Sequence, residues 1–193
     1  MKKVFSLLVA AIFVLSLASA AGAHGDSHYE HDNKYSPWVK KELKRVKEAT
    51  KKYRNVNKAL ADGFVNTKEY VYVKGLGGMG VHFVRPDRAS DGVVSATKPE
   101  ALLYMPLKGG GYQLIGVEYI VPAAATKIHP VLFGRKFDGP MLNHDLEPIA
   151  HTLKEKQKKL AKNNHYDLHV WLYKHNPAGL FAQFNPDLGP LKK

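Results

Sequence analysis

The feature that most constrains the fold is a change in the spacing of apolar residues near residue 69. Up to Phe64, apolar residues recur at steps of three and four, which is the period of one face of an α-helix. Beyond residue 69 the period is two, as in a strand with one buried face. A helix followed by short alternating segments predicts an α+β fold with an antiparallel sheet.

Two segments have the helical period. The first begins at Ser36-Pro37, where Ser36 suits the N-cap and Pro37 the first helical position, and it continues to about Gly63. Weak helix formers around Asn55 allow this segment to divide into two helices. The second segment, 147–164, is amphipathic. We expect the N-terminal helix and this second amphipathic helix to pack against the sheet.

Five segments have the period of strands, and turns rich in glycine or proline separate them. They are EYVYVK (69–74), VHFV (81–84), ALLYMPL (101–107), YQLIGVEYIV (112–121) and YDLHVWLY (166–173). The loop KGGG between the third and fourth is typical of a hairpin. The stretch 122–143 has no regular pattern. We therefore expect an antiparallel sheet of about five to seven strands.

The N-terminal residues have the order of a secretory signal peptide. Lys2 and Lys3 precede an apolar run over 4–17, and small residues follow it. The run is too short to anchor the chain in a bilayer, and cleavage patterns end at Ala20 and at Ala23. We expect residues 1–23 to be removed near Ala20 to Ala23 and the protein to be secreted or periplasmic.

The rest of the chain divides by composition. Residues 24–35 are polar and almost free of aliphatic side chains, which predicts a flexible leader. Residues 36–193 are enough for a single α+β domain with a core of its own. No later stretch is long and apolar enough to be a membrane span.

The sequence contains no cysteine. Disulfides, thiolate metal sites and cysteine nucleophiles are therefore excluded. Any metal must be held by nitrogen and oxygen, which suits a divalent transition metal such as zinc, iron, copper or manganese. A G-x-S-x-G turn is also absent, so nothing indicates a serine nucleophile, and whether the protein is an enzyme stays open.

The formal net charge is +12, and Lys2 and Lys3 account for two of these charges. The other lysines concentrate in 40–58 and 154–162, on the faces of predicted helices and without a recognised nucleic-acid-binding module. We expect solvated helix surfaces, no nucleic-acid partner, and at most a weak attraction to anionic polymers or lipids of the cell envelope.

Three predicted strands each carry one residue of ligand type among apolar neighbours. These residues are His82, Glu118 and His169. Two imidazoles and a carboxylate are the ligands of zinc hydrolases and of non-haem iron sites with open positions. The pattern predicts a metal site on the sheet face. Additional ligands could come from Asp167, His144 or His175, or Asp167 could hold the far nitrogen of a ligand histidine.

Two functions fit these residues. In the first, the protein is an extracytoplasmic metal-binding protein, with the option of a metal-dependent reaction on a small molecule. In the second, it is a non-catalytic module that binds a small ligand in an aromatic-lined pocket, where the histidines and Glu118 only orient the ligand. The aromatic residues expected to shape a pocket in either case are Tyr104, Tyr112, Trp171 and Tyr173.

A third, structural interpretation has the polar residues pair with one another inside the fold. A single strand histidine is more often a surface or hydrogen-bonded residue than a ligand. The separations between His82, Glu118 and His169 also match no compact ligand motif.

Four phrases of the sequence together resemble a family of secreted bacterial proteins without an established activity. They are GGMGVHFVRP, ALLYMPLKGGGYQLIGVEYIVP, LFGRKFDGPM and HYDLHVWLYKHNPAGLFAQFNP, within about residues 45–186. In that family the histidine of GMGxH, the glutamate of VEY and the histidine of LHVW are fixed, and they match His82, Glu118 and His169. The resemblance implies a shared metal or polar site, without naming a reaction.

The sequence departs from the family pattern at two places. Val81 stands where an aromatic residue is usual, and the lysine-rich segment between Pro140 and His165 is longer. The second departure leaves the roles of His144 and of the second predicted helix open.

Overall fold

The computed structural model describes residues 34–141 and 164–191. The signal peptide predicted for 1–23, nearly all of the leader predicted for 24–35, His144 and the helix predicted for 147–164 lie outside the described residues, apart from Asn164. Tyr35–Lys193 forms one compact unit.

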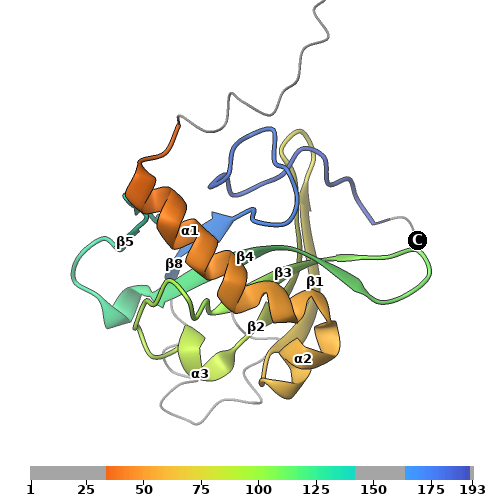
Figure 1. Ribbon diagram of the computed structural model, residues 1–193, viewed down its shortest axis with the longest axis horizontal. Coiled ribbons are helices and arrows are strands. Elements are labelled where there is room, and N and C mark those ends of the chain that lie inside the picture. Colours follow the sequence, from red (N-terminus) through yellow and green to blue (C-terminus); the bar gives the residue numbers. More distant parts are fainter. Residues whose placement is uncertain (1–33, 142–163, 192–193) are drawn as a thin grey trace, which may run out of the picture. The chain divides into compact units, whose positions relative to one another are not determined.

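The predicted α+β fold is confirmed, and its centre is a curled antiparallel sheet (Figure 1). The sheet has six strands in the order β1-β2-β3-β4-β8-β7. Their bounds are Val65–Val73 (β1), Gly77–Val84 (β2), Ala101–Pro106 (β3), Tyr112–Pro122 (β4), Asp138–Met141 (β7) and His165–Val170 (β8). A separate two-stranded sheet joins Val131–Leu132 (β5) to Arg135–Lys136 (β6).

Local sequence explains where the N-terminal helices begin and end. The helix α1, Pro37–Thr50, begins where the Ser36 Oγ accepts a hydrogen bond from the Val39 N–H at 3.3 Å. The 3-10 turn η1, Lys51–Arg54, ends at Asn55, whose side chain caps the next helix, α2, Val56–Ala61. The expected division of the helical segment at Asn55 is therefore present. Two further short helices are Pro86–Ala89 (α3) and the 3-10 turn Ala123–Ala125 (η2).

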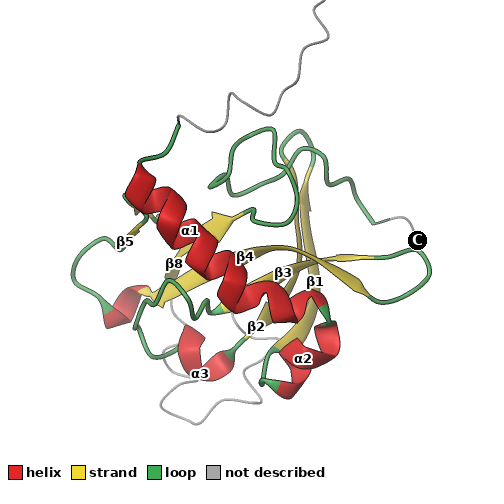
Figure 2. Ribbon diagram, viewed as in Figure 1, coloured by secondary structure: helices red, strands yellow, loops and turns green. Residues whose placement is uncertain are grey.

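The main hydrophobic core lies between α1 and one face of the sheet (Figure 2). The helix contributes Val39 and Val46, and the sheet contributes alternate residues of several strands, including Phe83, Tyr119 and Val170. Because side chains alternate across each strand, the neighbours of these core residues project from the opposite face of the sheet.

That opposite face carries two smaller apolar clusters. The first, at the end near α3, consists of Val84, Ala89, Ala101 and Ile120. The second consists of Leu103, Ile115, Trp171 and Leu188. The C-terminal segment, residues 185–188, therefore covers this part of the face. Ala101 of the first cluster is the direct strand partner of Glu118, and Leu103 of the second cluster is the direct strand partner of His82.

The glycine-rich start of β2 allows the C-terminal segment to approach the sheet closely. Gly78 and Asn185 exchange two backbone hydrogen bonds, of 3.1 and 2.9 Å. Gly77 has a φ of +106°, and a Cβ there would lie 2.1 Å from the Asn185 carbonyl oxygen. A glycine at this position therefore serves backbone packing.

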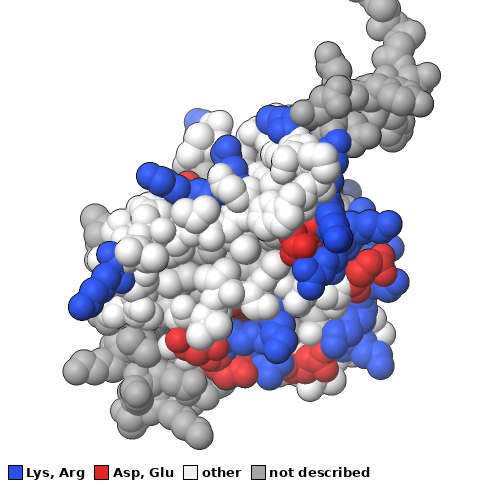
Figure 3. Space-filling view, turned by 60° about the vertical axis from the view of Figure 1, so that its left-hand side comes forward, with Lys and Arg blue, Asp and Glu red and all other residues white. Residues whose placement is uncertain are grey.

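Exposed basic side chains cover α1 and the turn after it. They include Lys41, Lys44, Arg45, Lys47, Lys51, Lys52 and Arg54. Acidic residues lie among them on this face of the protein, and three ion pairs, such as Lys52–Asp62 at 2.5 Å, reduce its charge (Figure 3). Among the described residues, no helix is both long and apolar enough to cross a membrane.

Candidate metal centre

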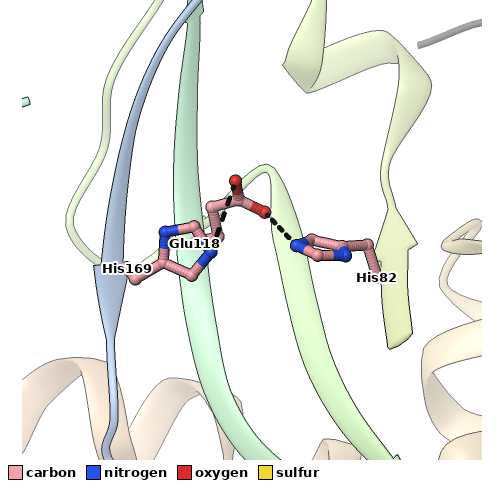
Figure 4. Close-up of side chains that lie close together, drawn as sticks. All are labelled: His82, Glu118 and His169. Carbon is pink, nitrogen blue, oxygen red and sulfur yellow. Dashed lines mark ion pairs between the residues drawn. The ribbon is translucent and has the colours of Figure 1, made fainter. Parts of the chain in front are cut away.

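The sheet brings together the three candidate ligands that the sequence placed on separate strands. Glu118 on β4 lies directly opposite His169 on β8 in the antiparallel register. His82 on β2 is separated from them by β3, whose small residue Ala101 is the direct partner of Glu118. The Glu118 side chain extends over β3, and its carboxylate lies between the two imidazole rings (Figure 4).

The distances within the group are close to those of a metal site. The Nε2 atom of His82 lies 3.4 Å from Oε2 of Glu118, and Nε2 of His169 lies 3.9 Å from Oε1 of the same carboxylate. One ligand atom from each residue can be chosen so that all three are within 4.8 Å of one another. Ligand atoms around a tetrahedral zinc are about 3.4 Å apart, so the group would contract by about 1 Å around an ion.

All three side chains are buried, with relative exposures of 8% for His82, 3% for Glu118 and 0% for His169. Within the part of the chain that the structure describes, Oε2 of Glu118 and both ring nitrogens of His169 have no hydrogen-bond partner. Burying polar atoms in this state is unfavourable, by about 1–3 kcal/mol for each one. The Glu118 carboxylate and one nitrogen of a neutral His169 ring offer lone pairs that a cation requires.

The residues of the group influence one another's protonation. Burial raises the pKa of Glu118 because the low-dielectric interior disfavours its anion. For His169, burial alone would lower the pKa, but the Glu118 and Asp167 carboxylates outweigh burial and raise it. The group therefore holds protons more tightly than the same residues would in water, and a bound cation would have to displace them.

Asp167 and His165 extend the polar group along β8. Asp167 is buried on the same face as His169, and its Oδ1 lies 3.6 Å from Nδ1 of His169. Its Oδ2 lies 4.0 Å from Nε2 of His165, which is also buried. His165 was not among the predicted site residues, because the predicted strand began at residue 166, whereas β8 begins at His165 and pairs there with β7. The alternation of His165, Asp167 and His169 was the available signal.

Two other predicted site residues lie in the loop after β8. Trp171 is buried on the site side, with its ring 6.5 Å from the His169 ring and nearly parallel to it. Its indole N–H donates to the Ala182 carbonyl at 2.6 Å, so the ring is fixed in place. His175 is exposed and does not belong to the group of His82, Glu118 and His169.

The expected pocket of aromatic residues needs correction, because three of its four members lie on the helix side of the sheet. The Tyr104 hydroxyl donates to the Tyr53 carbonyl at 2.6 Å, and the Tyr173 hydroxyl donates to the Lys47 carbonyl at 2.9 Å. Tyr112 packs against Phe83, with ring centroids 5.0 Å apart. These tyrosines therefore belong to the core under α1.

Two local irregularities account for the positions of Tyr112 and Tyr173, whereas Tyr104 alternates regularly with Leu103, the direct strand partner of His82. A register shift pairs Leu103 with Gly116 but Tyr104 with Leu114, so Ile115 is an extra residue in β4 and the alternation reverses there. Tyr112 and Glu118 consequently face opposite sides. The alternation of β8 ends at Val170, because the chain turns away and Tyr173 reaches α1.

A cavity of about 380 Å³ lies elsewhere, beside the segment between β2 and β3. Most of its lining residues are ionisable, including Arg85, Asp87, Arg88 and Lys98, and none of the three candidate ligands contributes to it. It is therefore not the aromatic-lined pocket that a small apolar ligand would require.

Comparison of the chain with protein-family models, with curated proteins and with solved structures finds no match. What the buried group does must therefore follow from its own geometry.

Proposed function

We propose that this protein binds one divalent transition-metal ion through His82, Glu118 and His169. The observation that carries the proposal is the convergence of two imidazoles and a carboxylate, from three strands, with ligand atoms within 4.8 Å of one another in a buried position. A cation there would accept lone pairs from atoms that otherwise lack hydrogen bonds among the described residues.

The ligand set restricts the class of metal. Imidazole and carboxylate suit zinc, iron, copper and manganese, and the absence of cysteine removes the thiolate ligands that favour copper(I) and iron–sulfur clusters. Three protein ligands leave at least one coordination position for water or for a small molecule. A hydrolytic or redox reaction on a small substrate is thus chemically accessible at this site.

The non-catalytic ligand module has less support. Its pocket required Tyr104, Tyr112 and Tyr173 beside the histidines, and their side chains belong to the core under α1. The purely structural interpretation has the three residues satisfy one another. It leaves both nitrogens of the fully buried His169 without hydrogen bonds among the described residues, which weighs against it.

Metal analysis of the purified protein tests the proposal. Tag-free protein, isolated from the cells that make it, is analysed by mass spectrometry for metals, together with His169→Ala and His175→Ala. We expect about one metal ion per chain in the wild type and in His175→Ala, whose histidine is exposed, and loss of the ion in His169→Ala. Folded wild-type protein that neither contains a metal nor binds added zinc would contradict the proposal.

We further propose that the protein works outside the cytoplasm. The support is the order of charged, apolar and small residues over 1–23. N-terminal analysis of the protein recovered from its host should find a chain that begins shortly after Ala20 or Ala23. A chain that retains residues 4–17 would contradict export by signal cleavage.

A further inference from the structure

We propose that Asp167 is a positioning residue of this site: its carboxylate holds the proton of His169 on Nδ1 and so directs the Nε2 lone pair at the metal. This inference rests on the proposed function, because it concerns how one ligand is oriented. It assigns a role to a buried carboxylate that lies outside the group of three ligands.

The geometry places a carboxylate at each nitrogen of the His169 ring. Nδ1 lies 3.6 Å from Oδ1 of Asp167, and Nε2 lies 3.9 Å from Oε1 of Glu118. A neutral imidazole has one N–H and one lone pair, so only the Nδ1–H tautomer offers a lone pair on the side of Glu118 and His82. A carboxylate at Nδ1 accepts a hydrogen bond and therefore favours that tautomer.

The distance requires only a small adjustment. At 3.6 Å the pair is longer than a hydrogen bond, and a shift of about 0.6 Å closes it. His169 has no exposed surface, so its ring has little freedom to take another orientation.

The position of Asp167 in the sheet suits an orienting role. Its backbone lies between Ile120 of β4 and Asp138 of β7, so it occupies an interior strand with a paired neighbour on both sides. Its second oxygen lies 4.0 Å from Nε2 of His165. Both carboxylate oxygens therefore face histidines, which restricts rotation of the group and fixes the oxygen that faces His169.

A matched pair of variants tests the inference. Asp167→Asn keeps the shape of the side chain and removes its charge, and Asp138→Asn removes the same charge from the exposed neighbour directly opposite on β7. Zinc affinity is measured by competition with a chelator, for proteins shown to be folded by circular dichroism. We expect Asp167→Asn to weaken zinc binding about 10- to 100-fold, as for other residues that orient metal ligands, and Asp138→Asn to change it less than about threefold.

A second measurement requires no variant. Long-range proton–nitrogen correlation spectra of the metal-free wild type report which nitrogen of His169 carries the proton, and we expect Nδ1–H in its neutral form. An Nε2–H tautomer in the wild type, or unchanged zinc affinity in a folded Asp167→Asn, would overturn the inference. These outcomes differ from failure of the proposed function, in which the wild type itself binds no zinc.

Discussion

At the scale of single residues, the site is defined by buried groups whose protonation depends on one another. Burial raises the pKa of Glu118, and the neighbouring carboxylates raise the pKa of His169. A metal can bind only when the ligand atoms are deprotonated, so protons and metal compete for the same lone pairs.

Zinc affinity is therefore expected to increase with pH. Below the raised pKa values the metal-free group holds protons, and each proton that zinc displaces changes the apparent affinity by about tenfold per pH unit. We expect a gain of about 100-fold or more between pH 6 and pH 8, because displacement of one proton over two pH units already amounts to that. Titration calorimetry in buffers of different ionisation enthalpy checks this by counting the protons released. Affinity that is constant over this range would mean that zinc binds elsewhere.

A second buried carboxylate, Glu100, should make stability depend on pH. Burial raises its pKa to about 9, although the Ile120 N–H donates to it at 3.1 Å. Between its ordinary pKa of 4.5 and 9 the folded state holds a proton that the unfolded state releases. Its contribution to the free energy of unfolding therefore falls as pH rises through this window.

The variant Glu100→Gln removes this titration. We expect the free energy of unfolding of the variant, minus that of the wild type, to rise by about 1 kcal/mol or more from pH 5 to pH 8. The reason is that only the wild type loses stability through the titration of Glu100. Urea denaturation at the two pH values measures the difference. An equal change in both proteins would show that Glu100 stays ionised in the fold.

At the scale of elements, backbone irregularities decide which side chains reach the site. The extra residue Ile115 in β4 turns Glu118 to the face opposite Tyr112. The glycines at the start of β2 let the C-terminal segment lie against this face, where it contributes Leu188 to the cluster with Trp171. The polar group is thus enclosed by elements that are distant in sequence.

Gly75, in the turn before β2, and Gly77, the first residue of β2, provide a matched test of this packing. In Gly77→Ala the new Cβ would lie 2.1 Å from the Asn185 carbonyl oxygen, whereas at Gly75 no atom lies within 4 Å. Both residues have positive φ, which alone disfavours alanine by about 1–2 kcal/mol. We expect Gly75→Ala to lower the free energy of unfolding by only that amount and Gly77→Ala to lower it by about 3 kcal/mol or more. Equal losses in thermal unfolding would show that the close approach contributes nothing.

At the scale of the whole molecule, the sequence predicted what depends on local patterns. The cap at Ser36, the division at Asn55 and the strands that carry the three candidate ligands follow from spacing and residue type. The small strands β5, β6 and β7 were not predicted, because 131–141 is irregular and its pairing depends on partners elsewhere.

The faces of Tyr112 and Tyr173 could not be predicted for a related reason. Strict alternation fails at a bulge, and Ile115 has no sequence feature that marks it as the extra residue. Tyr173 lies beyond the end of β8, where alternation no longer applies. The candidate ligands were easier to single out, because a histidine or glutamate among apolar strand neighbours is conspicuous in itself.

Metal binding should also stabilise the whole fold, because the ligands come together only in the folded chain. At a free zinc concentration about 100-fold above the dissociation constant, the expected gain is about 2.7 kcal/mol. We expect His82→Ala to lose this gain, and His175→Ala, altered at an exposed histidine, to retain it. Denaturation with and without zinc measures the effect. A gain that persists in His82→Ala would remove that residue from the ligand set.

Metal binding by His82, Glu118 and His169 is tested most directly by anomalous diffraction at the zinc edge from crystals grown with one equivalent of zinc. We expect one strong peak within about 2.2 Å of a ring nitrogen of His82, a ring nitrogen of His169 and a carboxylate oxygen of Glu118. A zinc peak held by other residues would contradict metal binding by these three side chains.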